Sequence, residues 1–75
     1  MNDGNRAKQY RKWLNSLPVI RKSNFDGISF ELRQDLENNE LVLVRYEYGK
    51  YDCSLLQSDY HKEQFDSMLK ELGLN

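Results

Sequence analysis

Pro18 is the only proline of the chain, and the spacing of the apolar residues differs on its two sides. The apolar residues before it follow helical spacing, with Trp13 widening a stripe of Ala7, Tyr10, Leu14 and Leu17. We predict a helix over residues 5–17 with Asp3 or Asn5 as its N-cap. The helix should end at the proline, because the residue before a proline is pushed out of the helical conformation.

The pattern becomes alternating after residue 27, which indicates half-buried strands. Ile28, Phe30 and Leu32 alternate with polar residues and predict a strand over residues 28–34. Residues 41–48 and 51–57 fit two further strands. Tyr48-Gly49-Lys50-Tyr51 fits a two-residue type II′ turn between them, with Gly49 in its first central position. Whether Val19-Ile20 forms an extra strand is left open.

The predicted turn sets a register in which Val44 faces Leu55 and Tyr46 faces Cys53. Keeping the apolar residues of the first strand on that face requires a loop with an odd number of residues. We therefore predict a three-residue loop, Glu37-Asn38-Asn39, with Asn39 in the left-handed conformation. The expected core face then carries Ile28, Phe30, Leu32, Val42, Val44, Tyr46, Cys53 and Leu55.

A helix over residues 59–72 is the last predicted element, capped by Ser58 and Asp59. Its expected buried stripe is His61, Phe65, Met68, Leu69 and Leu72. Gly73 and Leu74 fit a Schellman end. The chain thus predicts a single small α+β domain over residues 1–75 with the order α-β-β-β-α. A three-stranded antiparallel meander would pack against two helices, and whether they share one sheet face is left open.

The composition argues against an enzyme. Eleven Lys+Arg against twelve Asp+Glu disfavour both a uniformly basic nucleic-acid binder and a polyacidic DNA mimic. One Cys and one His exclude a disulfide framework and a multi-cysteine or His-rich metal site. Cys53 is expected to face inward, where a thiol is inert. The four glycines are scattered and form no phosphate loop. We expect no enzymatic activity, no metal and no cofactor.

Targeting signals are also missing from the pattern. The first twelve residues contain no apolar stretch, and no run approaches the ~18 apolar residues of a membrane span. A lone cysteine fits a reducing compartment. We expect a cytoplasmic protein with no membrane partner.

Leu41, Leu43 and Leu56 fall on the other face of the predicted sheet, where three leucines form a candidate partner-binding patch. The alternative is that one helix, or the segment Pro18-Val19-Ile20, covers them. The leading hypothesis is a small non-enzymatic protein-interaction module, a regulator, adaptor or inhibitor. Residues 23–75 are net acidic, so a partner with a basic surface is expected.

Two alternatives remain. Residues 1–22 are net basic, and a candidate nucleic-acid site consists of Lys8, Arg11, Lys12, Arg21 and Lys22. The same cations also fit an ordinary solvated surface, and nucleic acid is the less favoured partner. The other alternative is a structural homodimer that uses the leucine patch on itself. The identity of the partner does not follow from the sequence.

Overall fold

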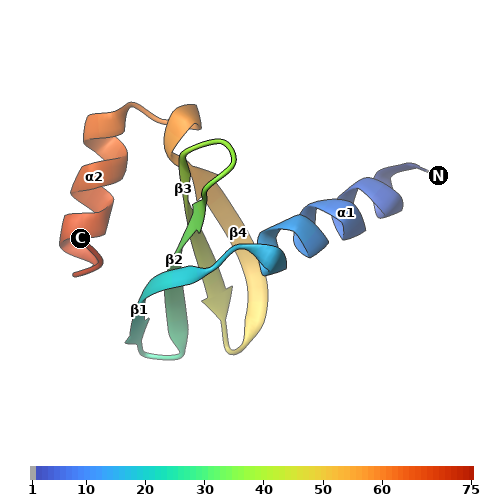
Figure 1. Ribbon diagram of the computed structural model, residues 1–75. Coiled ribbons are helices and arrows are strands. Elements are labelled where there is room, and N and C mark those ends of the chain that lie inside the picture. The colour runs from blue at the N-terminus through green and yellow to red at the C-terminus, as the bar shows by residue number, and fades with distance from the viewer. Residues whose placement is uncertain (1) are drawn as a thin grey trace.

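The chain forms a small α+β domain in which a four-stranded antiparallel sheet lies between two helices (Figure 1). The computed structural model describes residues 2–75. The elements are α1 (Asn2–Ser16), β1 (Val19–Phe25), β2 (Ile28–Asp35), β3 (Glu40–Glu47), β4 (Lys50–Leu56), the 3₁₀ turn η1 (Gln57–Asp59) and α2 (Lys62–Glu71). The strands lie in the order β1-β2-β3-β4. The predicted α+β class is confirmed, but the predicted count of three strands is wrong.

The additional strand is β1, which contains Val19 and Ile20 and extends to Phe25. It is joined to β2 by the two-residue turn Asp26-Gly27, across which Phe25 pairs with Ile28. Both turn residues have positive φ, 49° at Asp26 and 79° at Gly27. These are the conformations of a type I′ turn, whose twist matches that of the flanking strands.

The loop between β2 and β3 has four residues, Leu36 to Asn39, rather than the predicted three. Asp35 stabilises it by accepting the main-chain N–H of Glu37 at 3.1 Å and the Asn38 side-chain amide at 2.7 Å. Asn39 has a φ of 53°, which confirms its predicted left-handed conformation. Because the loop is even-numbered, Leu32 pairs with Leu43 rather than with an even-numbered residue, and the predicted core face is wrong.

The β3–β4 turn also differs from the prediction. Its central residues are Tyr48 and Gly49, with φ values of 51° and 81°, and Glu47 pairs with Lys50. The turn is therefore of type I′ rather than type II′. A bulge follows, because Tyr46 pairs with Tyr51 whereas Arg45 pairs with Cys53.

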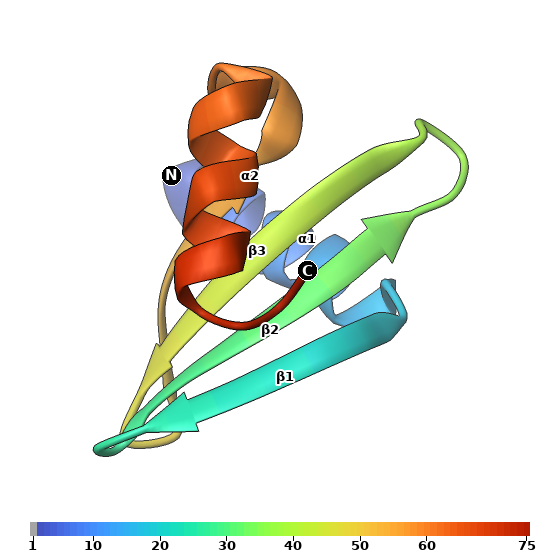
Figure 2. The same ribbon diagram turned by 90° about the vertical axis from the view of Figure 1, so that its left-hand side faces the viewer.

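The two helices do not share one face of the sheet but cover opposite faces (Figures 1 and 2). On the α1 face the core consists of Leu14, Leu17, Val42 and Val44, with Tyr10, Trp13, Tyr46 and Leu56 packed around it. On the α2 face it consists of Leu32, Leu43, Phe65, Leu69 and Leu74, with Phe30, Leu41, Leu55, Met68 and Leu72 around it. The expected single core face is thus divided between two cores.

Arg33 holds the carboxyl end of α1 on the sheet. Its Nη1 donates to the Leu14 carbonyl oxygen at 2.8 Å, and its Nη2 donates to Glu31 Oε1 at 2.6 Å and to the Tyr46 hydroxyl at 3.2 Å. Tyr10 and Ser54 are hydrogen-bonded through their hydroxyls farther along the helix. The amino-terminal end of α1 lies away from the sheet, and residues 4–9 are exposed (Figure 1).

The start of α2 differs from the prediction, and its end confirms it. The helix begins at Lys62, and its N-cap His61 is exposed and makes no side-chain cap bond. Ser58 bonds to Glu40 instead of capping α2. At the other end, Gly73 has a φ of 71°. Leu74 N–H donates to the Leu69 carbonyl at 2.8 Å and Gly73 N–H to that of Lys70 at 3.1 Å, which is a Schellman end.

Candidate functional site: an apolar pocket beside a free sheet edge

The three leucines predicted as a partner-binding patch do not lie together. Leu41 and Leu43 belong to the α2 face, and Leu56 belongs to the α1 face. Leu43 is only 2% exposed. The bulge in the β3–β4 pairing is the reason, because it pairs Leu56 with Val42 and places Leu55 opposite Leu43. The predicted open patch is therefore absent: Leu41 and Leu43 pack in the core under α2, and Leu56 packs in the core under α1.

Three of the five cations of the alternative nucleic-acid site share one face of α1. Lys8, Arg11 and Lys12 are exposed and lie on the side of the helix opposite its buried stripe. No carboxylate lies within ion-pair distance of these three side chains in the described part of the chain. The solvent side of α1 therefore presents a cationic face.

The other two cations lie on β1 and point to opposite sides of the sheet. Lys22 pairs with Glu31 on the α1 face, and its Nζ lies 3.7 Å from Glu31 Oε2. Arg21 pairs with Leu32 and so lies on the α2 face. Arg21 is thus on the opposite side of the sheet from α1, and the five cations do not form one surface.

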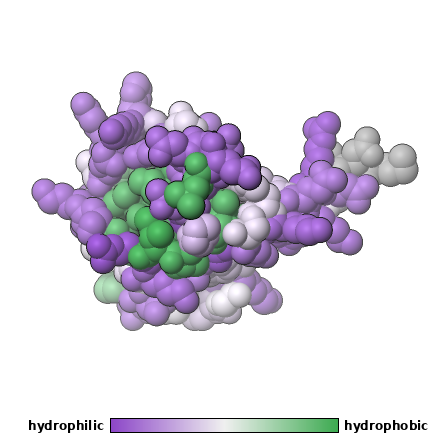
Figure 3. All heavy atoms as spheres, viewed as in Figure 1, coloured by the Kyte–Doolittle hydropathy of each residue, from purple (hydrophilic) through white to green (hydrophobic). Residues whose placement is uncertain are grey.

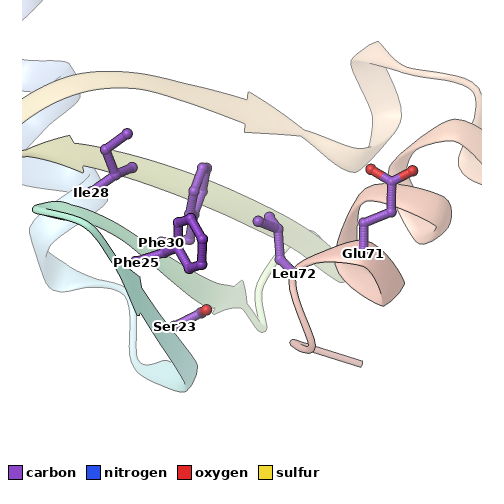
Figure 4. Close-up of a pocket in the computed structure, with 6 residues that line it drawn as sticks. All are labelled: Ser23, Phe25, Ile28, Phe30, Glu71 and Leu72. Atoms are coloured by element: carbon purple, nitrogen blue, oxygen red, sulfur yellow. The ribbon is translucent and has the colours of Figure 1, made fainter.

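An apolar pocket lies between the β1–β2 hairpin and the carboxyl end of α2 (Figure 4). It has a volume of about 280 Å³ and is lined by Ser23, Phe25, Ile28, Phe30, Glu71 and Leu72. Phe25 is 73% exposed. A space-filling view shows an apolar patch surrounded by hydrophilic surface between α2 and the sheet (Figure 3). Such a concave apolar surface with few polar groups is typical of a binding site.

The hairpin register and the helix end together build this pocket. Phe25 pairs with Ile28 and Ser23 with Phe30, so all four side chains project from the same face of the sheet. The Schellman end stops α2 at Glu71 and turns the chain inward to bury Leu74. The helix therefore covers β3 but leaves the tip of the β1–β2 hairpin open.

The outer edge of β1 borders the pocket. β1 is the terminal strand of the sheet, and its residues are exposed except for the half-buried Ser23. Neither helix lies beside this edge (Figure 2). An uncovered edge strand carries unpaired main-chain donors and acceptors, which are available to another extended chain.

The sequence reasoning missed this site, although a signal for it was present. Asp26-Gly27 between apolar residues is among the strongest local signals for a two-residue hairpin. It would have predicted the strand that ends at Phe25, and with it the pairing of Phe25 with Ile28. The position of α2 relative to this hairpin had no such local signal.

The structure corrects the expected position of the lone cysteine. Cys53 is exposed, so its predicted inward position is wrong. Across residues 2–75, no three His, Cys, Asp or Glu side chains are arranged to hold a metal ion. None of the helices described here is long and apolar enough to cross a membrane.

The fold and the pocket define a small α+β domain with a four-stranded meander and an apolar cleft at its edge. No protein-family model and no solved structure matches the chain. The chain is 51% identical over 41 residues to an uncharacterized protein of Aquifex aeolicus (strain VF5). This match covers 55% of the chain and 30% of that protein. The chain thus corresponds to less than a third of the relative, whose name states no activity.

Proposed function

We propose that the chain is a small non-enzymatic protein-interaction module, a regulator, adaptor or inhibitor that docks on another protein. The observation that carries this proposal is the open apolar pocket with Phe25 exposed at the tip of the β1–β2 hairpin. Covering an exposed phenylalanine and an apolar pocket with a partner stabilises the complex, by about 25 cal/mol per Å² of apolar area removed from water. The pocket replaces the leucine patch as the proposed contact surface.

Capture from a nuclease-treated lysate of the source organism tests the proposal with three immobilised forms of the protein. These are the wild type, Phe25→Asp, and the control Leu36→Asp. Leu36 is 74% exposed and lies in the β2–β3 loop. Its replacement by Asp also removes an exposed apolar side chain, but outside the pocket. We expect a stoichiometric partner on the wild type and on Leu36→Asp, and none on Phe25→Asp. Retention by Phe25→Asp, or no retained protein at all, would contradict the proposal.

A second candidate function, nucleic-acid binding through α1, is supported by the exposed cationic face that Lys8, Arg11 and Lys12 form on this helix. Three phosphate contacts would give affinity that falls with salt with a log–log slope of about −3. Fluorescence anisotropy with DNA and RNA probes measures this slope. Replacing these three residues by Gln should abolish binding. The same change at the exposed Lys50, Lys62 and Lys70 should leave binding intact. Salt-independent or undetectable binding would remove this candidate.

The proposed place of action is the cytosol, for which the free thiol of Cys53 is the support, because free thiols persist in reducing compartments. The homodimer alternative depended on the open leucine patch, which the structure does not contain. We therefore do not carry it forward.

A further inference from the structure

We propose that the docking surface takes an extended acidic segment of a partner protein, which adds to β1 as an antiparallel fifth strand. Its apolar side chains enter the pocket and its carboxylates pair with Arg21 and Lys22. This inference rests on the proposed function and specifies the partner's chemistry and mode of docking.

The pairing of β1 with β2 determines which main-chain groups of β1 remain free to form hydrogen bonds. Phe25 and Ile28 close a two-residue hairpin, and the closing pair of such a hairpin exchanges main-chain hydrogen bonds. Because bonded and non-bonded pairs alternate along an antiparallel ladder, Ser23 also bonds to β2. The N–H and C=O groups of Lys22 and Asn24 therefore point away from β2, toward the open edge. An incoming strand can bond to both residues.

The side chains beside this edge define what such a strand should contain. On the α2 face an added strand would lie next to Phe25 and Ser23, both of which line the apolar pocket. Its side chains at these positions should be apolar. Glu71 also lines the pocket, and its negative charge disfavours a carboxylate there.

Charge selects an acidic strand over a second copy of this chain. β1 carries Arg21 and Lys22 and no acidic residue. They lie on opposite faces of the strand, and the Lys22 side chain stays 64% exposed although it contacts Glu31. Pairing β1 with its own copy would place four cations along one short ladder. Two consecutive carboxylates in a partner strand would instead meet one cation on each face.

The probe is a fluorescein-labelled peptide, Thr-Phe-Thr-Val-Glu-Glu-Thr, written in antiparallel register. Its Phe lies opposite Phe25, its Val opposite Ser23, and its two Glu opposite Lys22 and Arg21 in turn. A second peptide with Lys in place of both Glu is the charge control. Fluorescence anisotropy should show binding of the acidic peptide and roughly tenfold weaker binding of the lysine peptide. The double variant R21E/K22E should reverse this preference, with circular dichroism confirming that it is folded.

N-methylation of the peptide separates strand addition from simple pocket binding. Methylating the peptide amide opposite Lys22 removes a bond to the β1 edge and should abolish binding. Methylating the amide opposite Ser23, which points away from β1, should leave binding unchanged. Equal effects at the two positions, equal binding of the two charge forms, or no binding of the acidic peptide would each overturn this inference.

Self-association is measured in parallel by sedimentation. A concentration-dependent dimer that Asn24→Pro abolishes would assign the edge to a second copy and overturn the inference. The proposed function fails separately, when Phe25→Asp captures the same partner as the wild type. If Phe25→Asp loses the partner while N-methylation has no effect on the peptide, the interaction module stands and strand addition is wrong.

Discussion

At the scale of single residues, Gly27 and Tyr48 join the tips of the two hairpins. Tyr48 donates its main-chain N–H to the Gly27 carbonyl oxygen at 2.8 Å. Its ring occupies the space beside Gly27, where an added Cβ would lie 2.5 Å from Tyr48 Cε1. Tyr48 itself has a φ of 51°, which is uncommon for a bulky residue. Tyr48 thus makes the contact between the two turns from a strained backbone conformation.

Gly27→Ala should destabilise the domain by about 1–3 kcal/mol, because alanine is strained at this φ and its methyl group meets the tyrosine ring. Gly49→Ala is the matched control. It has nearly the same φ, 81° against 79°, but nothing lies within 4 Å of its added Cβ. Urea denaturation should therefore show a smaller loss for Gly49→Ala. Equal losses would mean that the tyrosine ring moves aside at no cost.

Arg33→Ala should lower the free energy of unfolding by about 3 kcal/mol, since it leaves a largely buried carboxylate and the Leu14 carbonyl without their donor. Arg33→Lys should not restore stability, because one ammonium group cannot reach Leu14, Glu31 and Tyr46 in the planar geometry of a guanidinium group. Urea midpoints of both variants measure this. A lysine variant as stable as the wild type would show that charge alone holds α1.

At the scale of elements, α1 consists of two unlike halves. Its carboxyl half buries Leu14 against β3, whereas residues 4–9 of its amino half are exposed and include the cations Arg6 and Lys8. A short helix without tertiary contacts is marginally stable in water. We expect amide hydrogen exchange measured by NMR to be much faster at residues 6–9 than at residues 14–16. Uniform protection would mean that the amino half is stabilised by its own sequence.

Leu43→Lys should unfold the domain, because it places an ammonium group in the core under α2, where Leu43 is 2% exposed. Leu36→Lys, at an exposed position, should leave the fold intact. Far-UV circular dichroism separates the two outcomes. A folded Leu43→Lys would require the α2 face to open without loss of the sheet.

Elements with local signals were predictable from the sequence. Pro18 separates α1 from the sheet, alternation identifies β2, and Gly73 with Leu74 specifies the end of α2. Each depends on a few adjacent residues with a strong conformational preference. The strand that ends at Phe25 was predictable in the same way, because Asp26-Gly27 is a local signal for the turn that follows it.

The division of the core was not predictable in the same way. It depends on the parity of the β2–β3 loop, which the buried carboxylate of Asp35 sets by hydrogen bonding to Glu37 and Asn38. A charged residue at the end of a strand predicts exposure rather than burial. A change of one residue in loop length exchanges the two faces of β3. The pocket depends in addition on the position of α2 relative to the β1–β2 hairpin, which has no local signal in the sequence.

At the scale of the whole molecule, the sheet separates two cores that share strand β3 but not its side chains. Val44→Ala on the α1 face and Met68→Ala on α2 should each cost roughly 1–3 kcal/mol. Because the two sites lie on opposite sides of the sheet, the double variant should be additive within about 0.5 kcal/mol. Val42→Ala with Val44→Ala, on one face, should show a larger coupling energy in urea denaturation. Strong coupling across the sheet would mean that the cores respond as one.

The strand order β1-β2-β3-β4 follows the chain, so each strand pairs with its neighbour in sequence. Folding then requires only short loop closures, whose entropic cost is small, and each hairpin can form before the next strand is in place. Such a chain avoids the slow search for distant strand partners. It should reach its native sheet within about a second or less, with little time spent exposing an unpaired edge to aggregation.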